Sequence, residues 1–207
     1  MFKGTPEIIA QRREEIVGAC EKLYQTMSFK DITLKEIGNV TSFSRPTIYN
    51  YFHTKEEIFL ALFEREYNRW NDDLEKILEI DQEYSAEQIA DLIAKSLERR
   101  AQLLKLLSMN NFDMEENSRE ELLASFKTAY GKSLKLFRGI LEKHCPDMCD
   151  AEVEQIMYVF FPFMFGIYPY AEVTAKQKEA MAEAEVDYKY QTIYEITYNC
   201  LIRLLKN

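Results

Sequence analysis

The sequence contains little glycine and proline and no long apolar run. Six glycines and five prolines in 207 residues leave few positions for the many tight turns of an all-β fold. Stretches rich in Glu, Lys, Leu and Ala instead repeat their apolar residues at the helical period. The sequence therefore predicts an all-α protein.

Signals for a membrane or an oxidising compartment are also scarce. The most apolar stretch, residues 158–170, is shorter than the roughly 20 residues that a membrane-spanning helix requires. Residues 1–7 lack the apolar core of a signal peptide. The four cysteines are scattered without the pattern of a disulfide framework. We expect a cytoplasmic protein with no membrane partner.

Catalytic and metal-binding residues are few. The two histidines lie far apart in the sequence, and no nucleophile elbow, phosphate loop or metal motif is present. His144, Cys145 and Cys149 have side chains that bind zinc or copper, but three candidates beside a helix end do not complete a site. We expect no enzyme activity, no bound metal and no cofactor.

The charge is distributed unevenly along the chain. The net charge is −9, yet residues 1–55 contain eight Lys or Arg and six Asp or Glu, which gives +2 and leaves −11 for the remainder. An acidic surface repels nucleic acid phosphates. If the protein binds DNA, the N-terminal segment is therefore the part that contacts it.

Three short helices are predicted in that segment. The first extends from Thr5 to a break near Ser28, and Thr33 with Glu36 forms a capping box for a second that ends near Val40. After a three-residue connection, Ser44 caps a third helix that ends near Phe52. This is the spacing of a helix-turn-helix. Its expected core comprises Ala19, Leu23, Tyr24, Ile37, Val40, Ile48 and Phe52.

The other face of the third helix carries hydrogen-bonding side chains in place of the Glu and Lys of a solvated helix. Arg45 is suited to guanine edges and Asn50 to adenine, while Tyr49 and Lys55 are suited to phosphates. The opposite backbone could be held by Thr33 and Lys35. The alternative is a buried aromatic cluster, which we favour for Phe52 and leave open for Tyr51. The candidate DNA-binding residues are Thr33, Lys35, Ser44, Arg45, Pro46, Thr47, Tyr49, Asn50 and Lys55.

The stretch from Ser44 to Phe59, SRPTIYNYFHTKEEIF, resembles the signature of the TetR family of bacterial transcriptional regulators. The resemblance covers about residues 9–63 and implies a repressor that binds a palindromic operator. It also implies that Tyr49 and Lys55 contact phosphates. The sequence departs from the family at Ser42, where Gly is usual in the turn, and at Gly38, where Ala is usual.

The rest of the chain is predicted to form longer helices. We expect them at about residues 54–78, 86–110, 118–144, 150–173 and 187–205, with a short helix at 175–183. Residues 158–170 carry aromatic side chains on every side of their helix, which predicts burial all round.

The resemblance implies that this part binds a small-molecule effector and forms a homodimer. Candidate ligand-binding residues are Trp70, Met109, Phe112, Phe126, Tyr130, Phe161 and Phe165. Candidate dimer-interface residues are Tyr190, Ile193, Tyr194, Thr197 and Leu201. The alternatives are a plain core and a C-terminal stripe that packs only within its own subunit.

Together these features predict a helix-turn-helix domain over residues 1–54 and a ligand-binding and dimerisation domain over residues 55–207. The predicted function is that of a ligand-released repressor, whose partners are double-stranded operator DNA, a second copy of the chain and an effector of unknown identity. The alternatives are a helical adaptor that has lost DNA binding and, less favoured, an enzyme.

Overall fold

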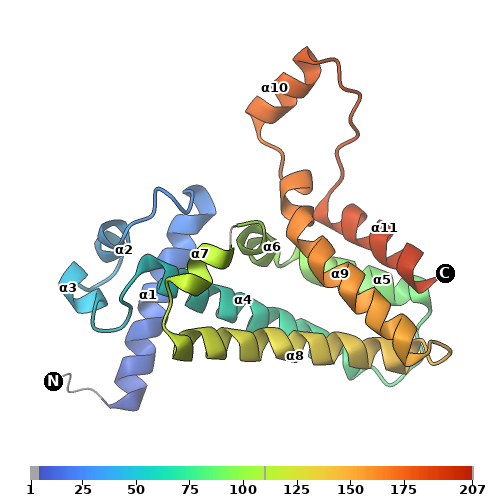
Figure 1. Ribbon diagram of the computed structural model, residues 1–207, viewed down its shortest axis with the longest axis horizontal. Helices are drawn as coiled ribbons and strands as arrows, with labels where there is room; N and C mark the ends of the chain where they lie inside the picture. The colour runs from blue at the N-terminus through green and yellow to red at the C-terminus, as the bar shows by residue number, and fades with distance from the viewer. Residues whose placement is uncertain (1–4, 110, 207) are drawn as a thin grey trace. The chain divides into compact units, whose positions relative to one another are not determined.

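The fold is all-α, as the sequence predicts. The computed structural model describes residues 5–109 and 111–206, so the first four residues of the N-terminal segment lie outside the described residues. The part of the chain that is described forms eleven helices and no strand (Figure 1). The helices are α1 (Pro6–Thr26), α2 (Leu34–Val40), α3 (Arg45–Ile48), α4 (Lys55–Leu78), α5 (Ala86–Glu98), α6 (Ala101–Leu107), α7 (Asn111–Glu116), α8 (Glu120–His144), α9 (Asp150–Ala171), α10 (Ala175–Glu183) and α11 (Ile193–Leu205).

The chain folds as two compact units. Unit 1 comprises residues 1–66 and 110–130, and unit 2 comprises residues 67–109 and 131–207. Both α4 and α8 therefore contribute residues to each unit. These units are defined by compactness, whereas the predicted boundary between residues 54 and 55 separates two functions. That boundary stays a prediction.

Unit 1 is built around the apolar side of α1. Tyr24 of α1 meets Phe59 of α4 edge to face at 5.2 Å between ring centroids, and Ile37, Ile48 and Phe52 are fully buried. Most of the predicted core is thus confirmed. Leu23 is only half-buried, and Val40, the last residue of α2, is 46% exposed.

In unit 2, α5 packs mainly against α11, and α9 packs against α6 and α11. The Trp70 indole lies inside this unit, where its Nε1–H donates to Ser96 Oγ at 3.0 Å. This hydrogen bond satisfies the one polar group of a large buried side chain.

The predicted helix at residues 86–110 is divided into α5 and α6 by a break at Arg99 and Arg100. No Gly or Pro marks this break in the sequence. Arg100 instead leaves helical geometry, with φ −111° and ψ 37°, and its Nε donates to Asp73 Oδ2 at 2.8 Å. Asp73 is only 7% exposed, so the ion pair with Arg100 compensates a partly buried carboxylate.

The last helix begins at Ile193 rather than near residue 187. Thr192 and Glu195 form a capping box, in which Glu195 N–H donates to Thr192 Oγ1 at 3.1 Å and Thr192 N–H donates to Glu195 Oε2 at 2.8 Å. The preceding α10 lies apart from α9 and α11 and contains no buried residue (Figure 1).

Burial of α9 is one-sided, contrary to the prediction that it is buried all round. Because α6 and α11 cover only part of its circumference, side chains such as Tyr158, 78% exposed, remain accessible within one chain. We name the exposed side the outer face of α9, which comprises Tyr158, Val159, Pro162, Phe165, Pro169 and Tyr170. No single helix of the described residues is long and apolar enough to cross a membrane, although α9 and α10 meet the length and composition test as a pair bent by 80°.

The four thiols differ strongly in their surroundings, which predicts unequal reactivity. Cys20 is fully buried in unit 1, and burial raises the pKa of its thiol to about 12, whereas Cys149 is exposed. At pH 8 we expect Cys149 to react with an aromatic disulfide reagent before Cys20 does. Cys149→Ser should remove the fastest phase, and rapid labelling of Cys20 in the native protein would contradict the buried position.

Candidate nucleic-acid interface

The turn between α2 and α3 is held from both sides. Thr33 is the N-cap residue of α2, and its Oγ1 accepts hydrogen bonds from the backbone N–H groups of Lys35 at 3.2 Å and Glu36 at 3.3 Å. In the turn, Ser42 donates its N–H and its hydroxyl to Glu15 Oε1 of α1, each at 2.8 Å. These two hydrogen bonds lower the pKa of Glu15 and fasten the turn to the first helix.

The two departures from the family pattern fit this backbone. Among the described residues only Glu185 has a positive φ, so Ser42 forms the turn without the left-handed conformation that favours glycine. A Cβ placed on Gly38 would meet its nearest neighbours at 3.7 Å, an ordinary contact distance. Ser in the turn therefore costs no backbone strain, and Gly38 stands where Ala would also fit.

The recognition helix α3 is short. It ends at Ile48, and hydrogen-bonded turns continue to Phe52, whose N–H donates to Ile48 O at 3.0 Å. Ile48 and Phe52 are fully buried, and Tyr51 is 4% exposed. The buried-aromatic alternative thus describes Phe52 and Tyr51, while Tyr49 is exposed.

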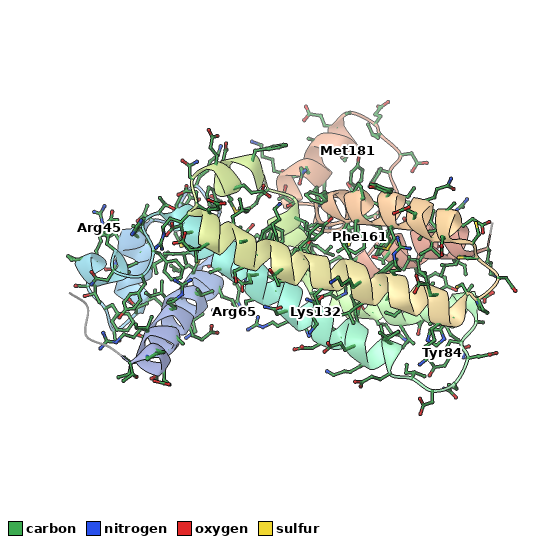
Figure 2. The ribbon with its side chains drawn as sticks, turned by 60° about the horizontal axis from the view of Figure 1, so that its bottom comes forward. Arg45, Arg65, Tyr84, Lys132, Phe161 and Met181 are labelled. Carbon is green, nitrogen blue, oxygen red and sulfur yellow. The ribbon has the colours of Figure 1, made fainter. Side chains whose placement is uncertain are left out.

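The exposed face of α3 carries the predicted base-reading groups. Arg45, Pro46, Tyr49 and Asn50 are exposed, Thr47 is half-buried, and Figure 2 shows Arg45 at the surface of unit 1. The Arg45 guanidinium donates from Nη2 to the Tyr49 hydroxyl at 3.2 Å. One turn of helix therefore holds an arginine and a tyrosine together, directed away from the core.

Ser44 and Thr47 bond to each other at the start of the same helix, with 2.9 Å between their hydroxyl oxygens. Ser44 is exposed, and its side chain makes no hydrogen bond that caps α3. Its predicted capping role is therefore wrong, although it does stand in the N-cap position.

Lys55 is directed at its own chain. Its Nζ donates to Phe29 O at 2.9 Å and Ile32 O at 3.3 Å, and lies 4.1 Å from the centroid of the Phe29 ring. Thr33 and Lys35, by contrast, are exposed. The side chain predicted to bind phosphate thus stabilises the connection between α1 and α2.

Two arginines of α1, which sequence reasoning missed, support the turns that follow the recognition helix. Arg12 Nη1 donates to the Tyr51 hydroxyl at 3.1 Å, and Arg13 Nη1 donates to Tyr51 O at 3.4 Å. The Arg13 guanidinium also lies 4.5 Å from the centroid of the Phe52 ring. The sequence gives no local signal for these pairs, because the partners are nearly 40 residues apart.

The predicted ligand-binding residues occupy different surroundings. In unit 2 the structure brings Trp70 to 6.0 Å, between ring centroids, from Phe161, which is labelled in Figure 2. Met109 is half-buried and Phe165 is 43% exposed. In unit 1, Phe126 packs against Phe63 at 4.9 Å between centroids. The other two candidate ligand-binding residues that lie in unit 1 are Tyr130, which is half-buried, and Phe112, which is 84% exposed.

The predicted dimer-interface residues of α11 face inward. Ile193, Thr197 and Leu201 are at most 5% exposed, and α11 packs mainly against α5 of the same chain. Tyr194 donates its hydroxyl to Asp91 Oδ1 of α5 at 2.8 Å. For these residues the structure follows the alternative of packing within one subunit. Tyr190, at 39% exposed, precedes the helix and contacts the Tyr188 ring.

The histidine and cysteines near residue 145 do not form a cluster. His144 packs against the Tyr84 ring at 5.8 Å, and burial lowers its pKa. Among the described residues, no group of three His, Cys, Asp or Glu side chains is close enough to hold a metal ion.

A short helix that presents polar side chains from a buried apolar platform, after a tight turn from a capped helix, defines a helix-turn-helix DNA-binding protein. Residues 16–62 match the family model described as "Bacterial regulatory proteins, tetR family", and residues 64–190 match "Tetracyclin repressor-like, C-terminal domain". The second match alone spans more than half of the chain, so the protein belongs to the TetR family. It is a DNA-binding transcriptional regulator and not an enzyme.

Solved structures of the same fold include three regulators called FadR, of which the one from Bacillus halodurans is described as a fatty acid degradation regulator. The protein from Bacillus halodurans is 14% identical, with a TM-score of 0.59 over 99% of this chain and 97% of that one. The Bacillus subtilis protein, in complex with stearoyl-CoA, is 15% identical with a TM-score of 0.60 over 93% and 97%. The Thermus thermophilus protein, in complex with lauroyl-CoA, is 19% identical with a TM-score of 0.58 over 93% of both chains. A comparison with curated proteins finds no match.

The position of Lys55 predicts a structural cost when its ammonium is removed. Lys55→Met should lower the free energy of unfolding by about 1–2 kcal/mol, because two backbone carbonyls lose a charged donor. Urea denaturation measures this, and Lys35→Met, at an exposed site, is the control with little expected change. Equal stability of both variants would show that the ammonium does not hold these carbonyls in solution.

Proposed function

We propose that the protein is a repressor that binds a palindromic operator as a homodimer and leaves it when a small molecule binds. The observation that carries the DNA-binding part is the exposed polar face of α3, with Arg45, Tyr49 and Asn50 mounted on buried Ile48 and Phe52. The acidic remainder of the chain favours contact through this face.

Within this proposal the residues have separate roles. Arg45 reads a guanine edge, and Asn50 pairs with adenine in the major groove. Tyr49, Thr33 and Lys35 bind phosphates on either side of that groove, with Ser44, Pro46 and Thr47 at the groove-facing start of α3. Lys55 joins them if its ammonium leaves its carbonyl partners when DNA binds.

The outer face of α9 supports the homodimer. Tyr158, Pro162, Phe165 and Pro169 follow one another at intervals of four, three and four residues, which is the spacing of a helix face that packs against another helix. An adjacent groove of about 340 Å³ extends this surface to α11 and is lined by Met148, Glu152, Gln155, Ile156, Val159 and Leu204. We therefore place the dimer contact on α9 and the outward side of α11, not on the buried stripe of α11.

A dimer also suits the length of the recognition helix. One helix of four residues reaches only a few bases. Two copies about one DNA turn apart read a palindrome, and together they bind more tightly than either copy alone.

An apolar effector is the class of ligand that unit 2 supports. Trp70, Phe137, Phe160 and Phe161 are buried in its interior, and aromatic linings favour flat or apolar molecules. The Bacillus subtilis and Thermus thermophilus FadR structures contain acyl-CoA thioesters, so stearoyl-CoA and lauroyl-CoA are the first effectors to test. A regulator with these partners works in the cytoplasm.

Selection from random DNA tests the operator-binding part. Arg45→Ala should weaken binding of the selected operator by about 1–3 kcal/mol and relax its base preference, and Tyr49→Phe should also weaken it. Lys35→Ala should reduce the dependence of log K on log salt by about one unit. Lys176→Ala, an exposed change in α10, is the control. Selection of no sequence by the wild type would favour the adaptor alternative.

Sedimentation tests the dimer contact. Phe165→Glu should convert a dimer into a monomer of 24.5 kDa, because a charge replaces an apolar side chain in the proposed interface. Ile8→Glu is a matched control, since Ile8 is 42% and Phe165 is 43% exposed in the single chain. A Phe165→Glu protein that sediments as the wild type would exclude the outer face of α9 as the interface.

A further inference from the structure

An almost completely buried carboxylate lies in the first turn of α4. Glu57 is 1% exposed, and its Oε1 accepts from Arg119 Nε at 2.7 Å and from the Arg119 backbone N–H at 3.2 Å. Its Oε2 accepts from Arg119 Nη2 at 3.0 Å and from the His53 N–H at 2.7 Å. Both oxygens are therefore held by two donors each, and one residue, Arg119, supplies three of the four.

The same short segment before α8 makes two further bonds to the end of the helix-turn-helix. Arg119 Nη2 also donates to Tyr51 O at 3.1 Å. The Thr54 hydroxyl donates to Asn117 O at 3.0 Å. Residues 117–119 thus hold the stretch from Tyr51 to Glu57, which begins three residues after the recognition helix ends. All of these residues belong to unit 1.

A buried ion pair of this kind is costly to break. Burial by itself raises the pKa of Glu57. The hydrogen bonds from the Arg119 side chain and from the His53 and Arg119 backbones together lower it by more than burial raises it, so the pKa lies below the usual carboxyl range. A lowered pKa means that the pair stabilises the fold above the normal carboxyl pKa and that this contribution is lost as the pH falls through the folded value. At neutral pH, loss of the guanidinium removes its two hydrogen bonds to a buried carboxylate and the cation paired with it.

We infer that Arg119 is a positioning residue for DNA binding, which holds the segment that follows the recognition helix without touching the DNA. The inference rests on the proposed role of α3 in binding the operator. A helix of four residues has little stability of its own, and Tyr51 O, three residues after its end, accepts hydrogen bonds from both Arg13 and Arg119. Arg119 directly precedes Glu120, the first residue of α8, so a shift of that helix end moves the guanidinium and the segment that it holds.

The test uses the full-length protein and the operator selected with the wild type. Arg119→Gln should weaken binding tenfold or more at a temperature at which the variant is fully folded, while the slope of log K against log salt stays that of the wild type. Arg119→Lys keeps a cation beside Glu57 but loses the bidentate geometry, so it should show a smaller loss. Arg138→Gln is the matched control, since the side chains of Arg119 and Arg138 are both 34% exposed and Arg138 pairs with the exposed Glu142 and Glu154.

Unchanged affinity in both Arg119 variants would overturn the inference. A slope lowered by about one unit would overturn it too, because Arg119 would then be a phosphate contact. Amide hydrogen exchange without DNA gives an independent result: residues 49–57 should exchange faster in Arg119→Lys than in the wild type or Arg138→Gln. If the wild-type protein selects no operator, the proposed function is wrong. If exchange over residues 49–57 is unchanged in Arg119→Lys, the positioning role is wrong whatever the outcome of the selection.

Discussion

A helix of four residues has little stability of its own in water, because nucleation costs more than its few hydrogen bonds return. The recognition helix α3, whose main neighbour is α2, therefore depends on the burial of Ile48 and, after its last residue, of Phe52. Burial of each such side chain stabilises the folded state by about 1.5–3 kcal/mol. The polar face is exposed as a consequence, because the same few residues cannot turn both sides inward. Every group proposed to contact DNA from α3 is placed by this constraint.

The polar contacts around α3 follow from the same need for support. Ser42 is fastened to Glu15, and Tyr51 receives hydrogen bonds from Arg12, Arg13 and Arg119. Basic side chains near a DNA-binding surface therefore divide into two groups. Some, such as Lys35, are exposed and available to phosphates, while others, such as Lys55, are occupied by the carbonyls of their own domain.

Unit 2 shows how an apolar helix can have two different faces. The buried side of α9 carries Met164 and Phe160, whose ring stacks on Phe137 of α8, while the outer face of α9 is also aromatic and remains exposed in one chain. The sequence pattern of α9 has no polar side and predicts burial all round. The proposed homodimer would cover the outer face with a second copy of the chain. For α11 the pattern was ambiguous between a partner helix and its own chain, and α5 occupies the stripe.

The sequence by itself determined the elements whose signals are local. Thr33 and the periodicity of Ile37, Ile48 and Phe52 were sufficient to place the helix-turn-helix, because caps and buried stripes depend on residues three or four positions apart. The tertiary structure alone decided the break at Arg100, the inward orientation of α11, and the pairing of Glu57 with Arg119. Those features join residues 27 or more positions apart. The partner of a charge or of an apolar stripe cannot be read from the local sequence when it lies far along the chain. The buried platform of the DNA-binding surface was therefore predictable, while the side chains that hold it in place were not.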